Sequence, residues 1–206
     1  MKILFISLGC DKNLADSEEM LGLLTGNGHE IVDSEEEADA IVINTCCFIH
    51  DAKEESVNTI LEMAEYKKTG TCKILIVTGC MAQRYKEEIT EEIPEVDAVL
   101  GTTSYGDIVK ALNEAEAGHV FREFKDINAL PEDSGRRVIT TGGHFGYLKI
   151  AEGCDKHCTY CIIPSLRGKF RSVPEERLLK QAEYMASQGV RELILVAQET
   201  LSLIHI

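Results

Sequence analysis

The sequence predicts an α/β protein, with an open parallel sheet and flanking helices in its N-terminal part and the start of a second β/α unit behind it. From residue 2 to about residue 112, short β-branched runs alternate with helical apolar spacing, as expected for a parallel sheet covered by helices. A stretch rich in Gly, Pro and acidic residues then precedes a further strand, helix and strand.

The first unit is predicted to contain four strands and four helices. We place the strands at residues 2–7, 40–44, 73–77 and 98–100. Apolar side chains that recur every three or four residues predict the helices. These side chains are Leu14, Leu21 and Leu24, then Val57, Ile60, Leu61 and Ala64, then Tyr85, Ile89 and Ile93, and finally Ile108, Leu112 and Ala115.

The second unit is predicted to consist of a strand over 144–151, a long loop over 153–172, a helix over 174–188 and a strand over 192–197. One strand, one helix and one strand bury too little surface to be stable alone. The chain therefore divides into a first domain, a linker, a second unit and an atypical tail, over residues 1–124, 125–143, 144–200 and 201–206.

The composition is that of a globular protein, with 206 residues, 44% apolar and 27% charged. Eight unevenly spaced cysteines in a chain of this size indicate a reducing compartment and metal or redox chemistry, so we expect a cytoplasmic location. The apolar run that ends at Cys10 imitates a lipoprotein signal, but it is short and leads directly into a helical pattern. No stretch approaches the roughly eighteen apolar residues of a membrane span.

The net charge of −14 is unevenly distributed, because residues 136–180 carry +5 and the remainder carries −19. The acidic remainder is a poor surface for a nucleic-acid backbone, so we expect no direct nucleic-acid binding. A basic stretch of this kind is usually a solvated face. Its position around three of the cysteines also leaves open a role in holding an anionic ligand.

Cys10, Cys46 and Cys80 each follow a predicted strand directly. Because the carboxyl ends of parallel strands lie at one edge of a sheet, these thiols can converge in the crevice where open α/β domains bind ligands. Each also precedes a helix, whose N-terminal dipole lowers a thiol pKa. Gly9 and Gly79 would let the backbone approach closely.

A single unpaired cysteine is more often a small buried apolar side chain than a ligand. The equivalent positions of the three favour a shared site. Cys47 and Cys72 lack this placement, so we interpret both as structural.

Cys154, Cys158 and Cys161 place three thiols within eight residues, in a loop after a predicted strand. Such a set can surround one compact metal centre. A structural zinc site would need a fourth ligand, and His157 lies awkwardly inside the loop. A low-potential ferredoxin cluster would use four cysteines, whereas three leave one iron open to substrate or cofactor.

This spacing, with Tyr160 just before the last cysteine, resembles the radical S-adenosylmethionine (SAM) enzymes. Together the two cysteine triads resemble the methylthiotransferases, over essentially residues 1–199. The resemblance implies a UPF0004-like N-terminal domain with one 4Fe-4S cluster, followed by the start of a radical SAM partial β/α barrel with a second. The ligands would be Cys10, Cys46 and Cys80 for the first cluster and Cys154, Cys158 and Cys161 for the second.

Within this family, several segments look like the RimO type, which modifies an aspartate of the small-subunit ribosomal protein uS12. The tRNA-modifying relatives typically have Gly-Cys-Gln-Met-Asn where this chain has Gly-Cys-Asp-Lys-Asn at 9–13, and a basic residue near Phe48 and Ile49. The matching segments are Ser7-Leu-Gly-Cys-Asp-Lys-Asn-Leu-Ala-Asp-Ser-Glu18, Asn44-Thr-Cys-Cys-Phe-Ile49 with Glu55-Ser56, Gly79-Cys-Met-Ala-Gln-Arg-Tyr85, Pro94-Glu-Val-Asp97 and Lys149-Ile-Ala-Glu-Gly-Cys154.

The resemblance also implies a mechanism. SAM would bind the open iron held by the second triad, and an electron from a flavodoxin- or ferredoxin-type donor would cleave it to a 5′-deoxyadenosyl radical. That radical would take a hydrogen from the β-carbon of the aspartate, and the first cluster would carry the methylated sulfur passed to the substrate. The sequence identifies no further catalytic residue.

Several other polar residues have weaker assignments. Arg167 and Arg171 could contact a carboxylate or position the loop, although exposed loop arginines usually do nothing specific. Gln198 follows the second predicted strand of the barrel, where barrel enzymes place functional groups. The remaining four have the composition of a helix start and are Asn13, Asp16, Ser17 and Glu18.

The family would continue beyond residue 200 through the rest of the barrel and a TRAM domain, whereas residues 201–206 look atypical. We therefore expect this chain to be inactive alone. Two alternatives stay open, namely a tRNA adenosine methylthiotransferase and a non-catalytic iron-sulfur carrier.

Overall fold

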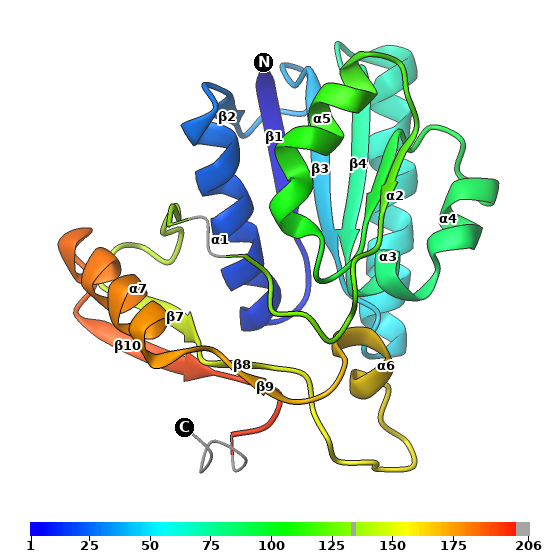
Figure 1. The fold of residues 1–206 in the computed structure, drawn as a ribbon. Helices are drawn as coiled ribbons and strands as arrows, with labels where there is room; N and C mark the ends of the chain where they lie inside the picture. The colour runs from blue at the N-terminus through cyan, green and yellow to red at the C-terminus, as the bar shows by residue number, and fades with distance from the viewer. Residues whose placement is uncertain (133–134, 201–206) are drawn as a thin grey trace.

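The computed structural model describes residues 1–132 and 135–200. Six parallel strands form one sheet in the order β2-β1-β3-β4-β5-β6, with helices on both faces (Figure 1). This arrangement confirms the predicted fold class. The tail at 201–206 lies outside the described residues.

The four strands predicted for the first unit are present, and two short strands at the sheet edges were not predicted. Strands β3 (Ala40–Thr45) and β4 (Ile74–Gly79) are buried along their whole length, which explains their continuous β-branched runs. The edge strands are only three residues long, so they carry no readable alternation. The other four strands of the sheet are β1 (Lys2–Ser7), β2 (Glu30–Val32), β5 (Ala98–Leu100) and β6 (Phe121–Glu123).

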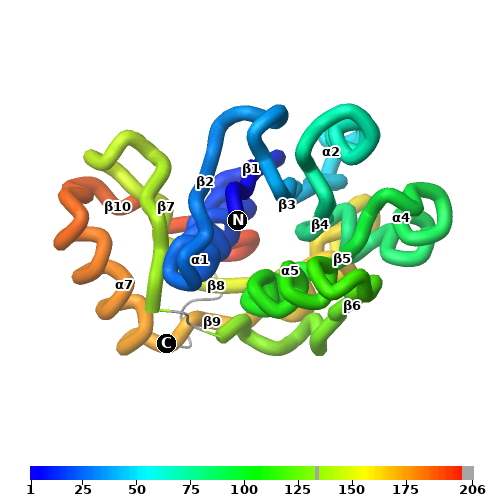
Figure 2. The backbone as a smooth tube through the Cα atoms, turned by 90° about the horizontal axis from the view of Figure 1, so that it is seen from above, coloured from blue at the N-terminus to red at the C-terminus, as the bar shows by residue number. Residues whose placement is uncertain are grey.

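Helices α1 (Asp11–Gly26) and α5 (Ile108–Glu116) cover one face of the sheet, and α2 (His50–Thr69) covers the other (Figure 2). The third predicted helix is divided into α3 (Cys80–Arg84) and α4 (Lys86–Glu92), because Tyr85 leaves the helical region with φ −118° and ψ 38°. A short 3₁₀ turn, η1 (Tyr105–Asp107), precedes α5. Among the described residues, none of the helices is both long and apolar enough to cross a membrane.

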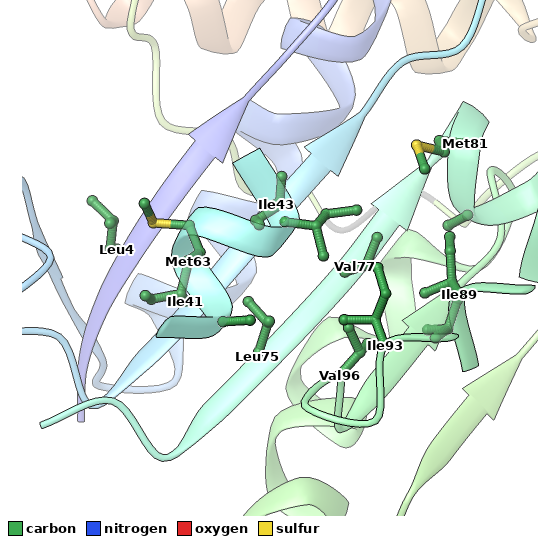
Figure 3. Close-up of a cluster of buried hydrophobic side chains, with 14 of the residues drawn as sticks. Leu4, Ile41, Ile43, Met63, Leu75, Val77, Met81, Ile89, Ile93 and Val96 are labelled. Atoms are coloured by element: carbon green, nitrogen blue, oxygen red, sulfur yellow. The ribbon is translucent and has the colours of Figure 1, made fainter. Parts of the chain in front are cut away.

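The apolar core forms two layers, one on each face of the sheet. Alternate residues of each strand enter opposite layers, as the pleat requires. The layer beneath α2, α3 and α4 is drawn in Figure 3. It includes Leu4, Ile41, Ile43, Met63, Leu75, Val77, Met81, Ile89, Ile93 and Val96.

The chain changes direction across the sheet between β1 and β3. It moves from β1 to the edge strand β2, and then returns to the other side of β1 as β3. In doubly wound sheets the ligand crevice opens at this switch point, outside the carboxyl ends of the strands. Figure 1 shows the strands pointing toward the side where α6 (Ile163–Arg167) lies.

The second unit is built on two parallel strands, β7 (Phe145–Lys149) and β10 (Glu192–Val196), with α7 (Glu175–Ser187) packed against them. A second pair, β8 (Ala151–Glu152) and β9 (Arg171–Ser172), is antiparallel.

The prediction of a loop over 153–172 is wrong in part, because α6 and β9 lie inside it. Pro164 occupies the first turn of α6, where its missing N–H costs nothing. A helix of five residues is too short to show an apolar period.

Buried ion pairs join α1 to the second unit, and we call this set the ionic seam. Glu18, fully buried on α1, accepts hydrogen bonds from Arg137 Nε (2.8 Å) and from the backbone N–H of Thr140 (2.7 Å). Two residues before Glu18 on the same helix, Asp16 pairs with Lys149 and with Arg167 Nη1 (2.7 Å). The seam consists of Asp16, Glu18, Arg137, Lys149, Glu152 and Arg167.

Removing one partner of the seam should destabilise the whole chain. We expect Glu18→Ala to lower the free energy of unfolding by about 3 kcal/mol, because it leaves Arg137 buried and unpaired. Urea denaturation followed by circular dichroism measures this change. The matched control is Glu37→Ala in the exposed pair with Lys2, which should cost less than about 1 kcal/mol. Equal losses in the two variants would contradict a structural role for the seam.

Candidate functional site

A cavity of about 910 Å³ lies at the carboxyl ends of the strands, and its lining includes Cys10, Cys46 and Cys80. The structure therefore brings together the three thiols that the sequence places at three strand ends. Arg167 of α6 and Gln198, which follows β10 in the sequence, also line this cavity. Its walls thus come from both units of the chain.

Two glycines allow the thiols to approach. Gly9 has φ +94°, and a Cβ atom built on it would lie 2.6 Å from Cys46 Cβ and 2.9 Å from its Sγ. Gly79 also has φ +94°, and a Cβ there would lie 2.5 Å from the Thr45 carbonyl oxygen. The close approach expected at both glycines is confirmed.

The thiol of Cys80 does not have the lowered pKa expected at the start of a helix. Burial raises the pKa of its thiol, although the positive charge of Arg167 acts in the opposite direction. The helix that Cys80 opens has only five residues, which gives a weak dipole. The Cys80 Sγ donates to Asn13 Oδ1 at 3.8 Å.

Cys47 and Cys72 are buried side chains of the core, as the sequence predicts. The Cys47 Sγ donates to the Cys80 carbonyl oxygen at 3.3 Å, and burial raises its pKa to about 12. The Cys72 Sγ donates to the Ile74 carbonyl oxygen at 3.4 Å. At both positions burial raises the pKa of the thiol and so disfavours the reactive thiolate.

Within residues 1–132 and 135–200, no three His, Cys, Asp or Glu side chains are gathered tightly enough for a single metal ion. A multinuclear cluster imposes a different requirement, because each thiolate binds a different iron atom and the sulfurs lie farther apart. A roomy cavity lined by three thiols fits that requirement.

The second triad is less gathered. Cys154 is buried at the start of its loop, Cys161 is half-buried and Cys158 is exposed. None of the three lines the cavity described above. The loop nevertheless has one feature of a cluster-binding loop, because the backbone N–H of Lys156 points to Cys154 Sγ at 3.4 Å.

The base of this loop is fixed by backbone contacts. Gly153 has φ +73°, and a Cβ there would lie 2.1 Å from the Lys169 carbonyl oxygen. The N–H of Cys154 donates to the Gly168 carbonyl oxygen at 3.1 Å. The N–H of Gly153 donates to Gln198 Oε1 at 2.9 Å, so Gln198 contacts this loop as well as lining the cavity.

Arg167 contacts a carboxylate, which is the first of the two readings that the sequence left open, and it is not an exposed loop arginine. Its side chain is only 3% exposed, and it donates to Asp16 Oδ2 and to Asn13 Oδ1. Asn13 in turn donates to the carbonyl oxygens of Leu8 (3.0 Å) and Thr45 (2.9 Å), just before Cys10 and Cys46. A chain of polar contacts therefore runs from α6, which follows the second triad in the sequence, to the first triad.

The four residues interpreted as a helix start do more than begin α1, because all of them are buried. Ser17 Oγ receives a hydrogen bond from Asn44 Nδ2 at 2.9 Å, which ties α1 to β3. Arg171 donates to the carbonyl oxygens of Arg167 and Lys169, so it positions the turn between α6 and β9. The buried members of α1 are Asn13, Asp16, Ser17 and Glu18.

Sequence reasoning missed Lys12. This residue lines the cavity, is 7% exposed, and its Nζ has no hydrogen-bond partner among the described residues. Burial lowers its pKa to about 8, against the opposing charge of Glu152. The only sequence signal for this residue was its position two residues after Cys10.

The close approach at Gly9 can be tested against a second left-handed glycine. Gly28 has φ +83° and open space around it, so Gly28→Ala should cost only the backbone strain, about 1 kcal/mol. Gly9→Ala adds the clash with Cys46 and should cost about 3 kcal/mol. Urea denaturation of the two variants checks the difference. Equal costs would mean that Gly9 is not needed to seat Cys46.

Comparison with known proteins assigns the two units to families. A family model described as Uncharacterized protein family UPF0004 matches residues 2–101, and a model described as Radical SAM superfamily matches residues 148–206. The chain is 65% identical over 200 residues to a protein of Lachnoclostridium phytofermentans named Ribosomal protein uS12 methylthiotransferase RimO. That alignment covers 97% of this chain and 46% of the relative.

Proteins of the same name in Clostridioides difficile and Acetivibrio thermocellus are each 50% identical to this chain. These alignments cover 97% and 96% of this chain and 45% of each relative. The chain thus spans about half the length of the curated relatives it matches. The chain thus combines a UPF0004 domain with the start of a radical SAM domain, and over nearly its whole length it is similar to these relatives named RimO.

Proposed function

We propose that this chain is the cluster-binding part of a radical SAM methylthiotransferase that adds a methylthio group to the β-carbon of an aspartate in ribosomal protein uS12. The observation that carries the proposal is the cavity at the sheet edge, which three strand-end thiols line together with residues of the second unit. The names of the relatives support the ribosomal substrate over a tRNA. The two matching family models support an enzyme over a carrier.

The residues present fit two 4Fe-4S clusters. Cys10, Cys46 and Cys80 would hold one, in a cavity large enough for it. Cys154, Cys158 and Cys161 would hold the other, with SAM at the iron that has no cysteine. When bound, these groups supply the one-electron cleavage of SAM and the sulfur that is transferred.

The chain itself supplies position and charge. Arg167 places a buried positive charge beside Cys80, which offsets the negative charge of ligated thiolates. Gln198 holds the start of the Cys154 loop at the edge of the cavity. Leu166 and Ile163 of α6 add apolar surface to the lining, which reduces the access of water to a radical.

The proposed partners follow from this chemistry. The substrate is the ribosomal protein, and the electron comes from a small flavodoxin- or ferredoxin-type donor. The eight cysteines are all free in the structure, which is consistent with a reducing compartment, and we propose that the protein acts in the cytoplasm.

Iron analysis tests the six ligands. After anaerobic reconstitution with iron and sulfide, the wild-type chain should bind about eight irons, and each triple variant about four. The variants are Cys10/Cys46/Cys80→Ala and Cys154/Cys158/Cys161→Ala. The matched control is Cys47/Cys72→Ala, which should keep the wild-type content. If a triple variant keeps the wild-type iron content, its three cysteines do not bind a cluster.

The reaction can be tested in a chimera that joins residues 1–200 of this chain to the remaining C-terminal part of the Lachnoclostridium phytofermentans relative. We expect the reduced chimera to form 5′-deoxyadenosine from SAM and to add one methylthio group to the uS12 aspartate, as seen by mass spectrometry. The Cys154/Cys158/Cys161→Ala chimera should form neither product. Modification of tRNA with no change in uS12 would favour the tRNA alternative.

A further inference from the structure

Lys12 is the most unusual polar group at the cavity. Its side chain is 9% exposed, its Nζ makes no hydrogen bond within the described residues, and its only ion pair is a long one to Glu152 Oε2 at 3.8 Å. A buried ammonium group that lacks hydrogen bonds is costly, and native proteins retain such groups where a ligand completes them. Its flexible stem lets the three N–H donors turn toward a bound group.

The charges around Lys12 do not balance. Three buried cations, Lys12, Lys149 and Arg167, surround two carboxylates, Asp16 and Glu152. The nearby Glu19 accepts a hydrogen bond from Tyr105 Oη at 3.0 Å. Among the three cations and two carboxylates joined by these ion pairs, one positive charge is left over, at the wall of an open cavity.

The cavity is polarised. Asp51 and Glu55 of α2 also line it, and both are exposed acidic side chains. These carboxylates disfavour an anion near α2. An anion in the cavity would therefore bind at the opposite wall, which contains Lys12. Lys12 also lies in the first turn of α1, where no side chain caps the backbone N–H groups and the helix dipole favours negative charge.

The rim of the cavity suits a protein ligand. Phe48 and Ile49 line it and are 55% and 57% exposed, which is unusual for such large apolar side chains next to a buried segment. An apolar rim around a buried cation matches a peptide loop that presents one acidic side chain. Arg167 already supplies the positive charge beside Cys80, so Lys12 is available for a second anion.

We propose that Lys12 binds the carboxylate of the aspartate that the enzyme modifies, and that it selects an acidic side chain over its neutral amide. This inference rests on the proposed function, because it takes the substrate to be an aspartate of a protein. A charge-assisted hydrogen bond from a buried lysine is worth about tenfold or more in affinity. Lys12 is thus a specificity residue that holds the target side chain above the cysteine-lined floor.

The test measures peptide binding rather than turnover. A fluorescent peptide that copies the uS12 segment around the target aspartate is titrated into the reconstituted chain, alongside the same peptide with asparagine. Wild type should bind the aspartate peptide about tenfold more tightly than the asparagine peptide. Lys12→Met should bind both peptides equally, at the affinity of wild type for the asparagine peptide. Lys12→Arg should restore the preference, and the matched control Lys53→Met, outside the cavity lining, should not change it.

Two results would overturn the inference. One is equal binding of both peptides, or of neither, by wild type, a comparison that needs no variant to fold. The other is a Lys12→Met protein whose iron content or cluster reduction potential departs from wild type, which would assign Lys12 to the cluster. A chimera that forms no methylthio product, while the aspartate preference persists and depends on Lys12, would instead refute the proposed function alone.

Discussion

The arrangement of this protein depends on the ionic seam between α1 and the second unit. Helix α1 carries charged side chains on the face that a surface helix would bury with apolar ones. Asp16 and Glu18 on this face are paired by residues 137–167, and Glu19 accepts a hydrogen bond from Tyr105. A buried ion pair adds little net stability, because desolvation offsets the attraction. It does fix geometry, since a shifted register would leave several charges unpaired at once. The seam therefore determines how α6 and Gln198 meet the strand ends.

The strand ends contribute the second constraint. Cys10 and Cys46 flank the switch point between β1 and β3, and Cys80 follows the next strand, so parallel topology alone gathers three distant cysteines. Gly9 turns the chain tightly enough to leave room for Cys46. The first triad is thus prepared by the backbone. The second triad lies in a loop whose base, at Gly153 and Cys154, is fixed by hydrogen bonds to other segments, while Cys158 near its middle is exposed.

The sequence pattern predicted the elements that are determined by the burial of nearby residues. The long buried strands and amphipathic helices were readable because their period reflects burial. The edge strands β2 and β6 and the short helix α6 were not, because three to five residues show no period. Asp16 and Glu18 were interpreted as helix starters because their partners lie more than a hundred residues away. The basic segment at 136–180 was the available signal, since it faces a charged helix in an otherwise acidic chain.

The charged face of α1 also has a consequence for synthesis. The first domain can fold as soon as its last strand has been made, before residues 137–167 exist to cover α1. A docking face built from leucine would expose an aggregation-prone apolar patch during that interval. One built from Asp16, Glu18 and Glu19 stays hydrated and repels its own copies until the basic segment arrives. The nascent chain is thereby protected from self-association at the stage when it is least complete.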